Sequence, residues 1–256
     1  MEPYYQDDSV TLYHGDCREV ITELGDFDAC IADPPYGTTN LEWDRWPTGW
    51  IAPIQQHTNS LWCFGTMRML LNHLPEFEGW RFAQDVIWAK EMATTRTIDR
   101  FRRQHDTLTH WFHGAWTDLR HCLPQVPHHG PPSGVRRRPD DGAAPAGARV
   151  IDNHFHAHTP WEDNGLRYMT SIIAAKRAPH RDRSNSTQKP LSITQPLIEY
   201  SVPPHGVLLD PFSGSGAILL AARQLNRRAV GIEINEAACE QIAKRLDQML
   251  LPFGES

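Results

Sequence analysis

The sequence predicts an α/β fold, a doubly wound and mostly parallel sheet of seven strands with an irregular insertion. Two observations carry this prediction. Short apolar runs alternate with helical patterns over much of the 256-residue chain, as they do in βαβ units. Two polar loops directly follow such runs, at the position where open α/β sheets bind their ligands. The length suits one large domain with a small insertion.

Seven apolar runs are predicted strands. Two of them, Asp85–Ala89 and Leu108–Phe112, have no convincing helix between them, so we expect an antiparallel pair joined by a long basic loop. The other predicted strands are Thr11–His14, Ala29–Ala32, Leu61–Phe64, Val207–Leu209 and Ala229–Ile232. The predicted helices are Arg18–Leu24, Trp50–Asn59, Ala217–Leu225 and Asn235–Leu250.

The middle of the chain differs from the rest in composition and charge. Over 118–188, proline, glycine, histidine and arginine dominate and apolar periodicity is largely absent, which indicates an irregular insertion. Residues 90–189 contain 16 Lys and Arg against 10 Asp and Glu, whereas the remainder contains 9 against 21. The basic middle is therefore the candidate for contact with a polyanion, and a solvated surface or a linker without function is the alternative.

The tetrapeptide Asp33-Pro34-Pro35-Tyr36 directly follows the predicted strand Ala29–Ala32. Its two prolines fix a rigid turn that presents a carboxylate, a backbone carbonyl and an aromatic ring. The carboxylate and the carbonyl can accept both N–H bonds of an exocyclic amine, while the ring stacks on a flat base. The alternative is a proline-rich loop that begins with an aspartate.

A second constellation is a glycine-rich turn between the strand Val207–Leu209 and the helix that begins at Ala217. Glycines let the backbone approach a ligand closely, and a helix N-terminus offers free N–H groups. Glu233 ends the next strand about 20 residues later, where an acidic side chain can hold both hydroxyls of a ribose. The candidate ligand residues here are Asp210, Phe212, Ser213, Gly214, Ser215, Gly216 and Glu233.

Two further polar residues lie close to predicted elements. Asp16 follows the first strand, where it can accept a hydrogen bond from an adenine amine or cap the next helix, and by itself the cap is favoured. Lys189, in Gln188-Lys189-Pro190, can face a carboxylate ligand or be an ordinary surface lysine.

Other sequence signals exclude several classes of protein. No apolar run approaches the length of a membrane span, and the N-terminus has no signal pattern. The five cysteines are scattered and form no CxxC pair, as is typical of free thiols in the cytoplasm. We predict no metal site, because the alternating His154, His156 and His158 lie in a generally histidine-rich stretch without Cys or acidic partners at ligand spacing.

Together these residues resemble the amino-methyltransferases of DNA that use S-adenosylmethionine. Asp33, Pro34, Pro35 and Tyr36 look like the catalytic motif, Asp210–Gly216 like the cofactor loop, Glu233 like the ribose ligand and Asp16 like the adenine contact. Gln188-Lys189-Pro190 looks like the segment that precedes the cofactor loop. The catalytic motif comes before the insertion and the cofactor loop, as in the circularly permuted β group.

The resemblance covers about 1–117 and 184–250. It implies a Rossmann-like methyltransferase domain made of a catalytic part (1–117) and a cofactor-binding part (184–256), interrupted by a target-recognition insertion (118–183). It further implies double-stranded DNA as the substrate, with the target base flipped out and the methyl group moved in one in-line step. A homodimer is compatible with the family. The location is then the cytoplasm of a bacterial or phage-infected cell, in a restriction–modification or phage-modification system.

The resemblance favours the N6 amine of adenine, because an Asp at the first motif position tends to accompany adenine and a Ser cytosine. N4-cytosine transfer on the same scaffold, glutamine methylation of a protein and a non-catalytic DNA-binding relative stay open. Cytosine C5 transfer is rejected, because no Pro-Cys dipeptide supplies its nucleophile. The predicted contacts to DNA phosphates are Arg96, Arg100, Arg102, Arg103, Arg136, Arg137 and Arg138.

Overall fold

The computed structural model describes residues 1–37, 41–91, 99, 101–127, 165–175 and 189–248. The chain divides into two compact units, one made of Met1–Leu123 and Thr170–Ser256 and the other of Pro124–Met169. In the smaller unit, strand β7 (Gln125–Pro127) pairs antiparallel with β8 (Leu166–Tyr168). Within the described ranges, no helix is both long and apolar enough to cross a membrane.

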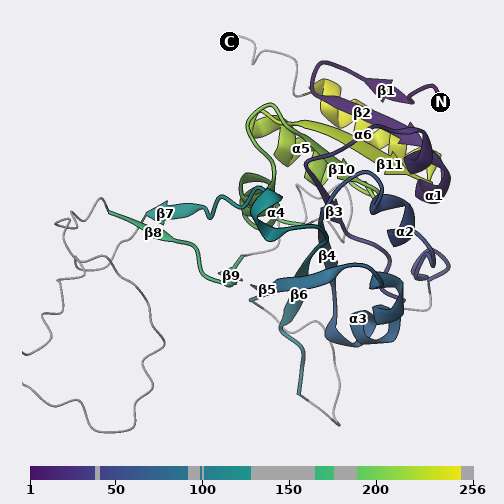
Figure 1. Ribbon diagram of the computed structural model, residues 1–256. Helices are drawn as coiled ribbons and strands as arrows, with labels where there is room; N and C mark the ends of the chain where they lie inside the picture. The colour runs from purple at the N-terminus through teal and green to yellow at the C-terminus, as the bar shows by residue number, and fades with distance from the viewer. Residues whose placement is uncertain (38–40, 92–98, 100, 128–164, 176–188, 249–256) are drawn as a thin grey trace, which may run out of the picture. The chain divides into compact units, whose positions relative to one another are not determined.

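The larger unit is built on a nine-stranded sheet, which Figure 1 shows in ribbon form. The five strands from β2 to β4 in the sheet order are parallel, and β6 pairs antiparallel with β4 on one side and with β5 on the other. The sheet order is β1 (Tyr5–Gln6), β2 (Val10–His14), β11 (Arg228–Glu233), β10 (Val207–Asp210), β3 (Ala29–Ala32), β4 (Ser60–Gly65), β6 (His105–Phe112), β5 (Arg81–Ala89) and β9 (Ile172–Ala174).

The predicted fold class is confirmed, and all seven predicted strands are present in the middle of this sheet. The prediction that Asp85–Ala89 and Leu108–Phe112 form an antiparallel pair is also confirmed. Two short strands, β1 and β9, extend the sheet beyond seven at its two edges. Strand β9 lies within the range predicted as the insertion, yet it pairs with β5 of the larger unit.

The helices agree less closely with the sequence prediction. Helix α1 (Cys17–Val20) with the 3-10 turn η1 (Ile21–Glu23), α5 (Ala217–Gln224) and α6 (Glu236–Gln248) lie where helices were expected. The prediction of a helix over Trp50–Asn59 was wrong in extent, because α2 spans only Ile51–Ile54. The chain then tightens into turns, in which Gln56 and His57 donate their amides to carbonyls three residues earlier. Two helices were not predicted: α3 (Met67–His73) and α4 (Leu191–Ser201).

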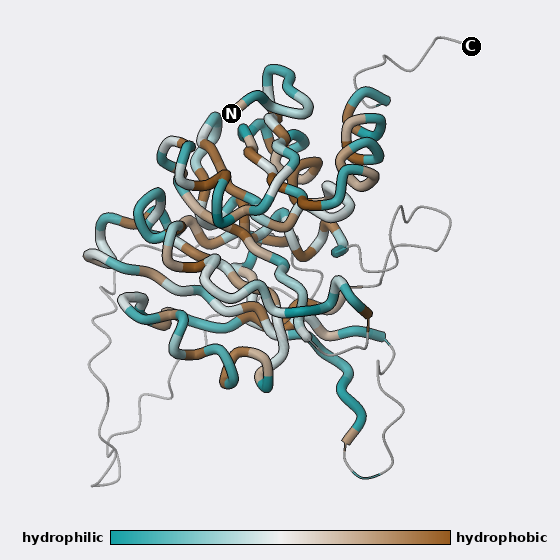
Figure 2. The backbone as a smooth tube through the Cα atoms, turned by 90° about the vertical axis from the view of Figure 1, so that its right-hand side faces the viewer, coloured by the Kyte–Doolittle hydropathy of each residue, from teal (hydrophilic) through white to brown (hydrophobic). Residues whose placement is uncertain are grey.

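Alternating side chains of each central strand pack into two separate cores, one on each face of the sheet. In β3, Ala29 and Ile31 belong to the core that contains α4, α5 and α6, whereas Cys30 and Ala32 belong to the core that contains α1, α2 and α3. This period of two, with helices on both faces, defines a doubly wound sheet. Helix α6, beside the C label in Figure 2, shows both hydrophilic and hydrophobic residues along its turns, as an amphipathic helix does.

Candidate active site

Three acidic residues lie at the carboxyl edge of neighbouring parallel strands. Asp33 follows β3, Asp210 ends β10 and Glu233 ends β11, and β10 pairs with both other strands. Burial raises the pKa of Asp210 well above its usual range, and the nearby charges of Asp33 and Glu233 act in the same direction, while the Phe212 amide opposes them. The two sequence motifs are therefore brought together at one edge, where open α/β sheets bind ligands.

Both carboxylate oxygens of Asp33 have a side-chain partner. The Tyr36 hydroxyl donates to Oδ1 at 3.0 Å, and the Lys189 ammonium donates to Oδ2 at 2.5 Å. The Lys189 nitrogen also lies 5.4 Å from the centre of the Tyr36 ring and 5.2 Å from that of Phe64, within the range of a cation–π contact. Burial, with a smaller contribution from Asp33, raises the pKa of Tyr36 well above its usual range, so its hydroxyl stays a donor.

The glycine-rich loop has the backbone conformation that its glycines predict. Gly214 and Gly216 have φ angles of 50° and 73°, in the left-handed region that side chains other than glycine seldom adopt. A Cβ atom on Gly216 would lie 3.0 Å from Cγ2 of Ile242 in α6. The loop is also tied to β11, because the Ser213 amide donates to the Ile232 carbonyl. Close packing and positive φ both require glycine at the start of α5.

Glu233 holds this loop in place. Its Oε2 accepts the Gly214 amide at 2.7 Å, and its Oε1 accepts the Asn235 amide at 2.9 Å. Each oxygen retains a further lone pair, so the carboxylate can bind a ligand hydroxyl as well as the loop. The sequence pointed to Glu233 as a ligand residue and did not reveal this second, structural role.

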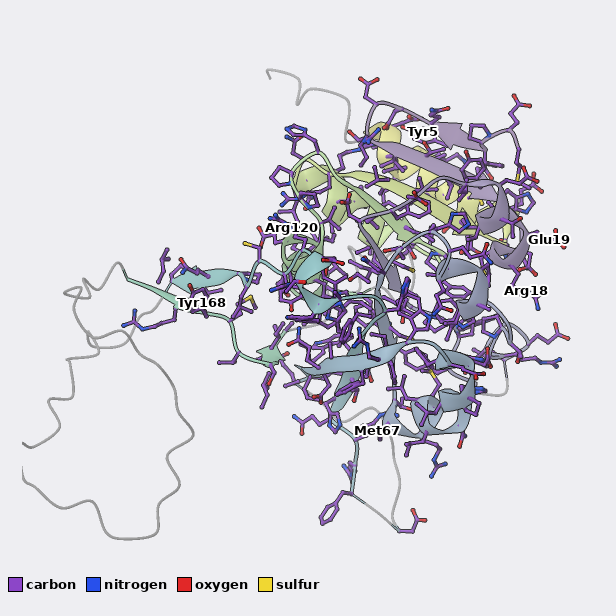
Figure 3. All side chains as sticks on the ribbon, viewed as in Figure 1. Tyr5, Arg18, Glu19, Met67, Arg120 and Tyr168 are labelled. Carbon is purple, nitrogen blue, oxygen red and sulfur yellow. The ribbon has the colours of Figure 1, made fainter. Side chains whose placement is uncertain are left out.

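Asp16 caps helix α1, as the sequence favoured. Its carboxylate accepts the Arg18 amide at 2.9 Å and forms an ion pair with the Arg18 guanidinium, which lowers the pKa of Asp16. Arg18 itself extends from the outer side of α1 (Figure 3). The Gly15 amide donates to the Glu233 carbonyl at 3.0 Å, which places Asp16 next to the end of β11. An adenine contact by Asp16 stays a prediction.

An aromatic cluster beside the glycine-rich loop was not recognised from the sequence. Phe212 packs edge-on against Trp50, with ring centres 5.0 Å apart. Trp46 packs edge-on against Trp50 and donates its indole N–H to Glu76 at 2.6 Å. Trp50 is fully buried, and its indole N–H has no hydrogen-bond partner in the structure as described. Trp46 lies outside the predicted helix Trp50–Asn59, so no periodic pattern in the sequence predicted its contact with Trp50.

A second lysine–aspartate pair, Lys90 and Asp106, also escaped sequence analysis. The Lys90 nitrogen lies 2.6 Å from Oδ2 of Asp106, and 6% and 5% of the two side chains are exposed. Asp106 pairs with Trp88 in the β5–β6 register, level with the carboxyl end of β4. The charge of Asp106 contributes to the raised pKa of Tyr36, which places this pair near the turn that contains Asp33 and Tyr36.

The predicted DNA contacts fall mainly outside the described residues. This applies to Arg96, Arg100, Arg136, Arg137 and Arg138, and also to the weighed histidines His154, His156 and His158. Arg102 is exposed and Arg103 is half-buried on the segment that enters β6. Because β6 runs antiparallel to β4, this segment reaches the sheet at the same edge as Asp33.

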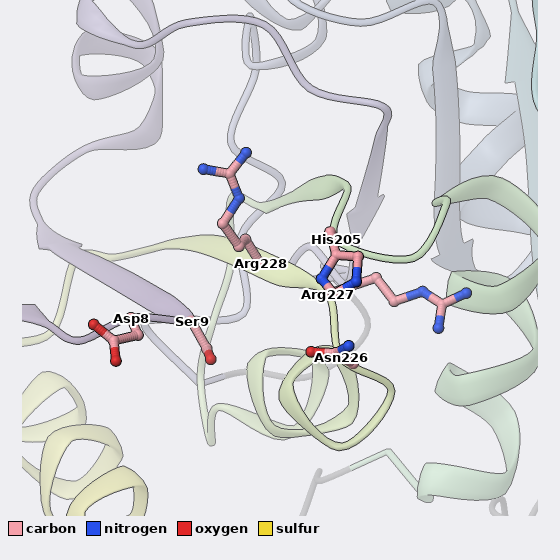
Figure 4. A pocket seen from close by; sticks show the side chains of 6 residues that line it. All are labelled: Asp8, Ser9, His205, Asn226, Arg227 and Arg228. Atoms are coloured by element: carbon pink, nitrogen blue, oxygen red, sulfur yellow. The ribbon is translucent and has the colours of Figure 1, made fainter.

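The structure also contains an open cavity of about 430 Å³, shown in Figure 4. It lies at the opposite edge of the sheet, because Arg228 begins β11 and His205 precedes β10. It therefore contains neither sequence motif. The residues that line it are Asp8, Ser9, His205, Asn226, Arg227 and Arg228.

The sheet and the loops at its carboxyl edge define a Rossmann-like methyltransferase fold. The chain matches the model of the N6/N4 DNA methylase family over residues 27–245, and it belongs to that family. It is 24% identical to the type II methyltransferase M.ScaI of Streptomyces caespitosus, over 96% of this chain and 84% of that one. The predicted membership of the N6/N4 family of DNA amino-methyltransferases is thereby confirmed.

Solved structures agree with this fold. The crystal structure of the M1.HpyAVI–SAM complex has a TM-score of 0.60 and 21% identity, and the match covers 92% of this chain and 99% of that one. The cytosine-N4-specific PvuII DNA methyltransferase has a TM-score of 0.64 and 12% identity, over 100% of this chain and 91% of that one. At these identities the likeness concerns the fold alone.

Proposed function

We propose that this DNA methyltransferase moves a methyl group from S-adenosylmethionine to the N6 amine of adenine in duplex DNA. The observation that carries the proposal is the position of Asp33 and Tyr36 at the end of β3, beside the glycine-rich loop that follows β10. This arrangement places an acceptor for an amine next to a loop suited to a nucleoside cofactor. Membership of the N6/N4 family supports an exocyclic amine as the target.

The catalytic turn is suited to a flipped base. An amine on an aromatic ring is a poor nucleophile, because its lone pair is delocalised into the ring. Asp33 and the Pro34 carbonyl accept the two N–H bonds, which favours a pyramidal nitrogen and fixes its direction. Tyr36 supplies an aromatic face that replaces the base stack lost on flipping, and Pro35 keeps the turn rigid.

The residues at the carboxyl edge fit S-adenosylmethionine. Glu233 has lone pairs for the ribose hydroxyls, and Gly214 and Gly216 let the backbone approach closely. Oδ2 of Asp210 is buried and has no hydrogen-bond partner in the structure as described, in a site that also holds Asp33 and Glu233. A ligand with cationic groups relieves this excess of negative charge. When bound, this cofactor supplies an electrophilic methyl group on a sulfonium.

The remaining roles extend the same proposal. Asp16 contacts the adenine of the cofactor, and Phe212, Ser213 and Ser215 shape the loop around it. DNA phosphates are bound by arginines of the basic middle of the chain, because the rest of the chain is net negative and repels them. These arginines are Arg96, Arg100, Arg102, Arg103, Arg136, Arg137 and Arg138. The family and the type II relative support a role in site-specific modification.

The main alternative is transfer to the N4 amine of cytosine. Both bases present one exocyclic amine beside a ring nitrogen, so Asp33 and the Pro34 carbonyl suit either base. The preference for adenine depends on the aspartate at position 33, through the resemblance stated above. A related non-catalytic DNA-binding protein would need neither an acceptor for the amine nor an intact cofactor loop.

Mass analysis of nucleosides from duplex DNA tests the proposal. DNA of mixed sequence is incubated with the protein and with S-adenosylmethionine labelled in its methyl group, then digested. We expect labelled N6-methyladenine from the wild type and from a control variant, Lys244→Met, whose exposed ion pair lies on α6. Labelled N4-methylcytosine would support the alternative. The absence of both products, with DNA binding retained, would support the non-catalytic relative.

A further inference from the structure

Lys189 contacts the catalytic carboxylate rather than an open part of the cofactor site. Its nitrogen lies 2.5 Å from Oδ2 of Asp33, and only 9% of its side chain is exposed. The residue immediately precedes Pro190, the N-cap of helix α4, so its backbone is held beside the helix while the four-carbon stem can turn. The sequence placed Lys189 with the cofactor residues, and the structure places it on the acceptor for the base.

This contact has a consequence for the state of Asp33. With Tyr36 on Oδ1 and Lys189 on Oδ2, both oxygens of the carboxylate are engaged by donors. Each oxygen keeps a second lone pair, but the ammonium beside Oδ2 draws electron density from the carboxylate and competes with the target amine as a charged N–H donor. We therefore expect Asp33 to accept the base more strongly when Lys189 turns away from Oδ2.

The cofactor offers the group that can draw Lys189 away. S-adenosylmethionine has one carboxylate, and the acidic residues of this edge, Asp33, Asp210 and Glu233, cannot pair with it. Among the described residues, Lys189 forms an ion pair with one member of this set, Asp33. When the Lys189 ammonium moves away, the positive sulfonium of the cofactor takes its place as the cation near the Asp33 carboxylate.

We propose that Lys189 is a positioning residue that links the two substrates, an inference that depends on the proposed function. Without cofactor, Lys189 binds Asp33 and keeps the base acceptor occupied. With cofactor, Lys189 binds the carboxylate of its methionine part, and Oδ2 of Asp33 becomes open to the target amine. The protein thus takes up the base productively only when the methyl donor is present. By thermodynamic linkage, a bound target base raises the affinity for cofactor by the same factor by which cofactor raises the affinity for the base. Such factors are typically about 5–150.

The proposal predicts a competition that calorimetry can measure without DNA. The probe is S-adenosylhomocysteine, which has the carboxylate, and the matched ligand is 5′-methylthioadenosine, which lacks the amino-acid part. Because Asp33→Asn weakens the hold on Lys189, we expect it to tighten S-adenosylhomocysteine binding by about fivefold or more. Lys189→Met should weaken S-adenosylhomocysteine binding. In the Lys189→Met background, Asp33→Asn should no longer tighten it. The affinity for methylthioadenosine should stay within twofold throughout.

Controls separate this mechanism from a general change of the site. Lys244→Met, which removes an exposed lysine from an ion pair on α6, should leave both affinities unchanged. Circular dichroism of each variant checks that it is folded, and Lys189→Arg, which keeps the charge, should retain part of the coupling. Unchanged S-adenosylhomocysteine affinity in Asp33→Asn, or an equal gain in the Lys189→Met background, overturns the proposal. Neither result bears on the proposed function, which is tested separately by the mass analysis of labelled nucleosides.

Discussion

Two lysine–aspartate pairs lie near Tyr36, and they differ in exposure. In the Lys189–Asp33 pair, 9% and 21% of the side chains are exposed, whereas the values for Lys90–Asp106 are 6% and 5%. The N–O distances are nearly equal, 2.5 and 2.6 Å. The two pairs therefore have the same chemistry and differ in solvent exposure. We expect Lys189–Asp33 to contact ligands and Lys90–Asp106 to stabilise the fold.

The difference follows from the position of each aspartate in the sheet. Asp33 lies in a loop one residue beyond the end of β3, while Asp106 lies within β6, paired with Trp88. Two charges enclosed in a sheet lose their hydration, and only good geometry between them compensates for this loss. A carboxylate at a loop keeps one side open for a ligand.

The largest expected effect comes from breaking the enclosed pair. Lys90→Met leaves the Asp106 carboxylate buried without its ammonium, which should lower the free energy of unfolding by about 3–5 kcal/mol. Urea unfolding followed by circular dichroism measures this change. A double variant, Lys90→Met with Asp106→Leu, should recover much of the loss, because no buried charge remains. Equal instability of the single and double variants would show that the charge is not the cause.

The Lys189–Asp33 pair should respond in activity rather than in stability. Asp33→Ala removes an acceptor for the target amine, so we expect methyl transfer to fall by on the order of 10²-fold or more. The affinity for S-adenosylmethionine should stay within a few-fold, because the release of Lys189 is offset by the lost attraction between Asp33 and the sulfonium. Urea unfolding should change less than in Lys90→Met. Single-turnover kinetics with labelled cofactor gives the rate. Turnover near the wild-type rate would remove Asp33 from the mechanism.

Glu233 combines the two kinds of role that separate the lysine–aspartate pairs. It holds the glycine-rich loop through the Gly214 amide, and it is proposed to bind the ribose of the cofactor. Glu233→Ala should weaken S-adenosylmethionine binding by about tenfold to a hundredfold, from the loss of charge-assisted bonds of about 1.5–3 kcal/mol. Glu233→Gln should retain part of this affinity, because its amide oxygen can still accept one bond. Calorimetry gives both constants. DNA affinity should change little in either variant, since Glu233 is proposed to contact the cofactor and not the DNA phosphates.

The two motifs were predictable because their signals are local. Asp33–Tyr36 and Asp210–Gly216 each follow an apolar run, so a strand, a turn and a function could be inferred from neighbouring residues. The contact between Lys189 and Asp33 joins residues 156 positions apart, and no local pattern reveals such a pair. The same holds for β1 and β9, which are two and three residues long and depend on their partners for pairing.

The helices illustrate the same limit. Helix α6 was predicted because its apolar residues recur on one face over 13 residues. Helix α3 has only seven residues, follows β4 after a single residue and begins at a Thr66 cap that only the structure makes evident. Its side chains at Met67 and Leu71 are exposed despite being apolar, so the pattern of burial does not follow the pattern of hydropathy.

The last expected effect concerns His110, a buried group that stays uncharged at neutral pH. Its ring is fully buried and stacks on Trp62 at 4.4 Å, and its Nε2 lies 3.0 Å from the Ser60 hydroxyl. Burial, with a smaller contribution from the charge of His121, lowers the pKa of His110 to about 4 from the ordinary 6.5. The unfolded chain therefore binds a proton below pH 6.5 that the folded protein does not bind until about pH 4.

Acid should consequently destabilise the fold through this residue. The contribution of His110 is fully present above pH 6.5 and falls as the pH drops toward 4, by up to about 1.4 kcal/mol per pH unit. Urea unfolding between pH 7 and 5 measures the slope. His110→Phe removes the titration and keeps a ring on Trp62, so its slope should be shallower than that of the wild type. His105→Gln, at an exposed position on the same strand, is the control. Equal slopes for all three proteins would mean that His110 takes up its proton in the folded state as readily as in the unfolded chain.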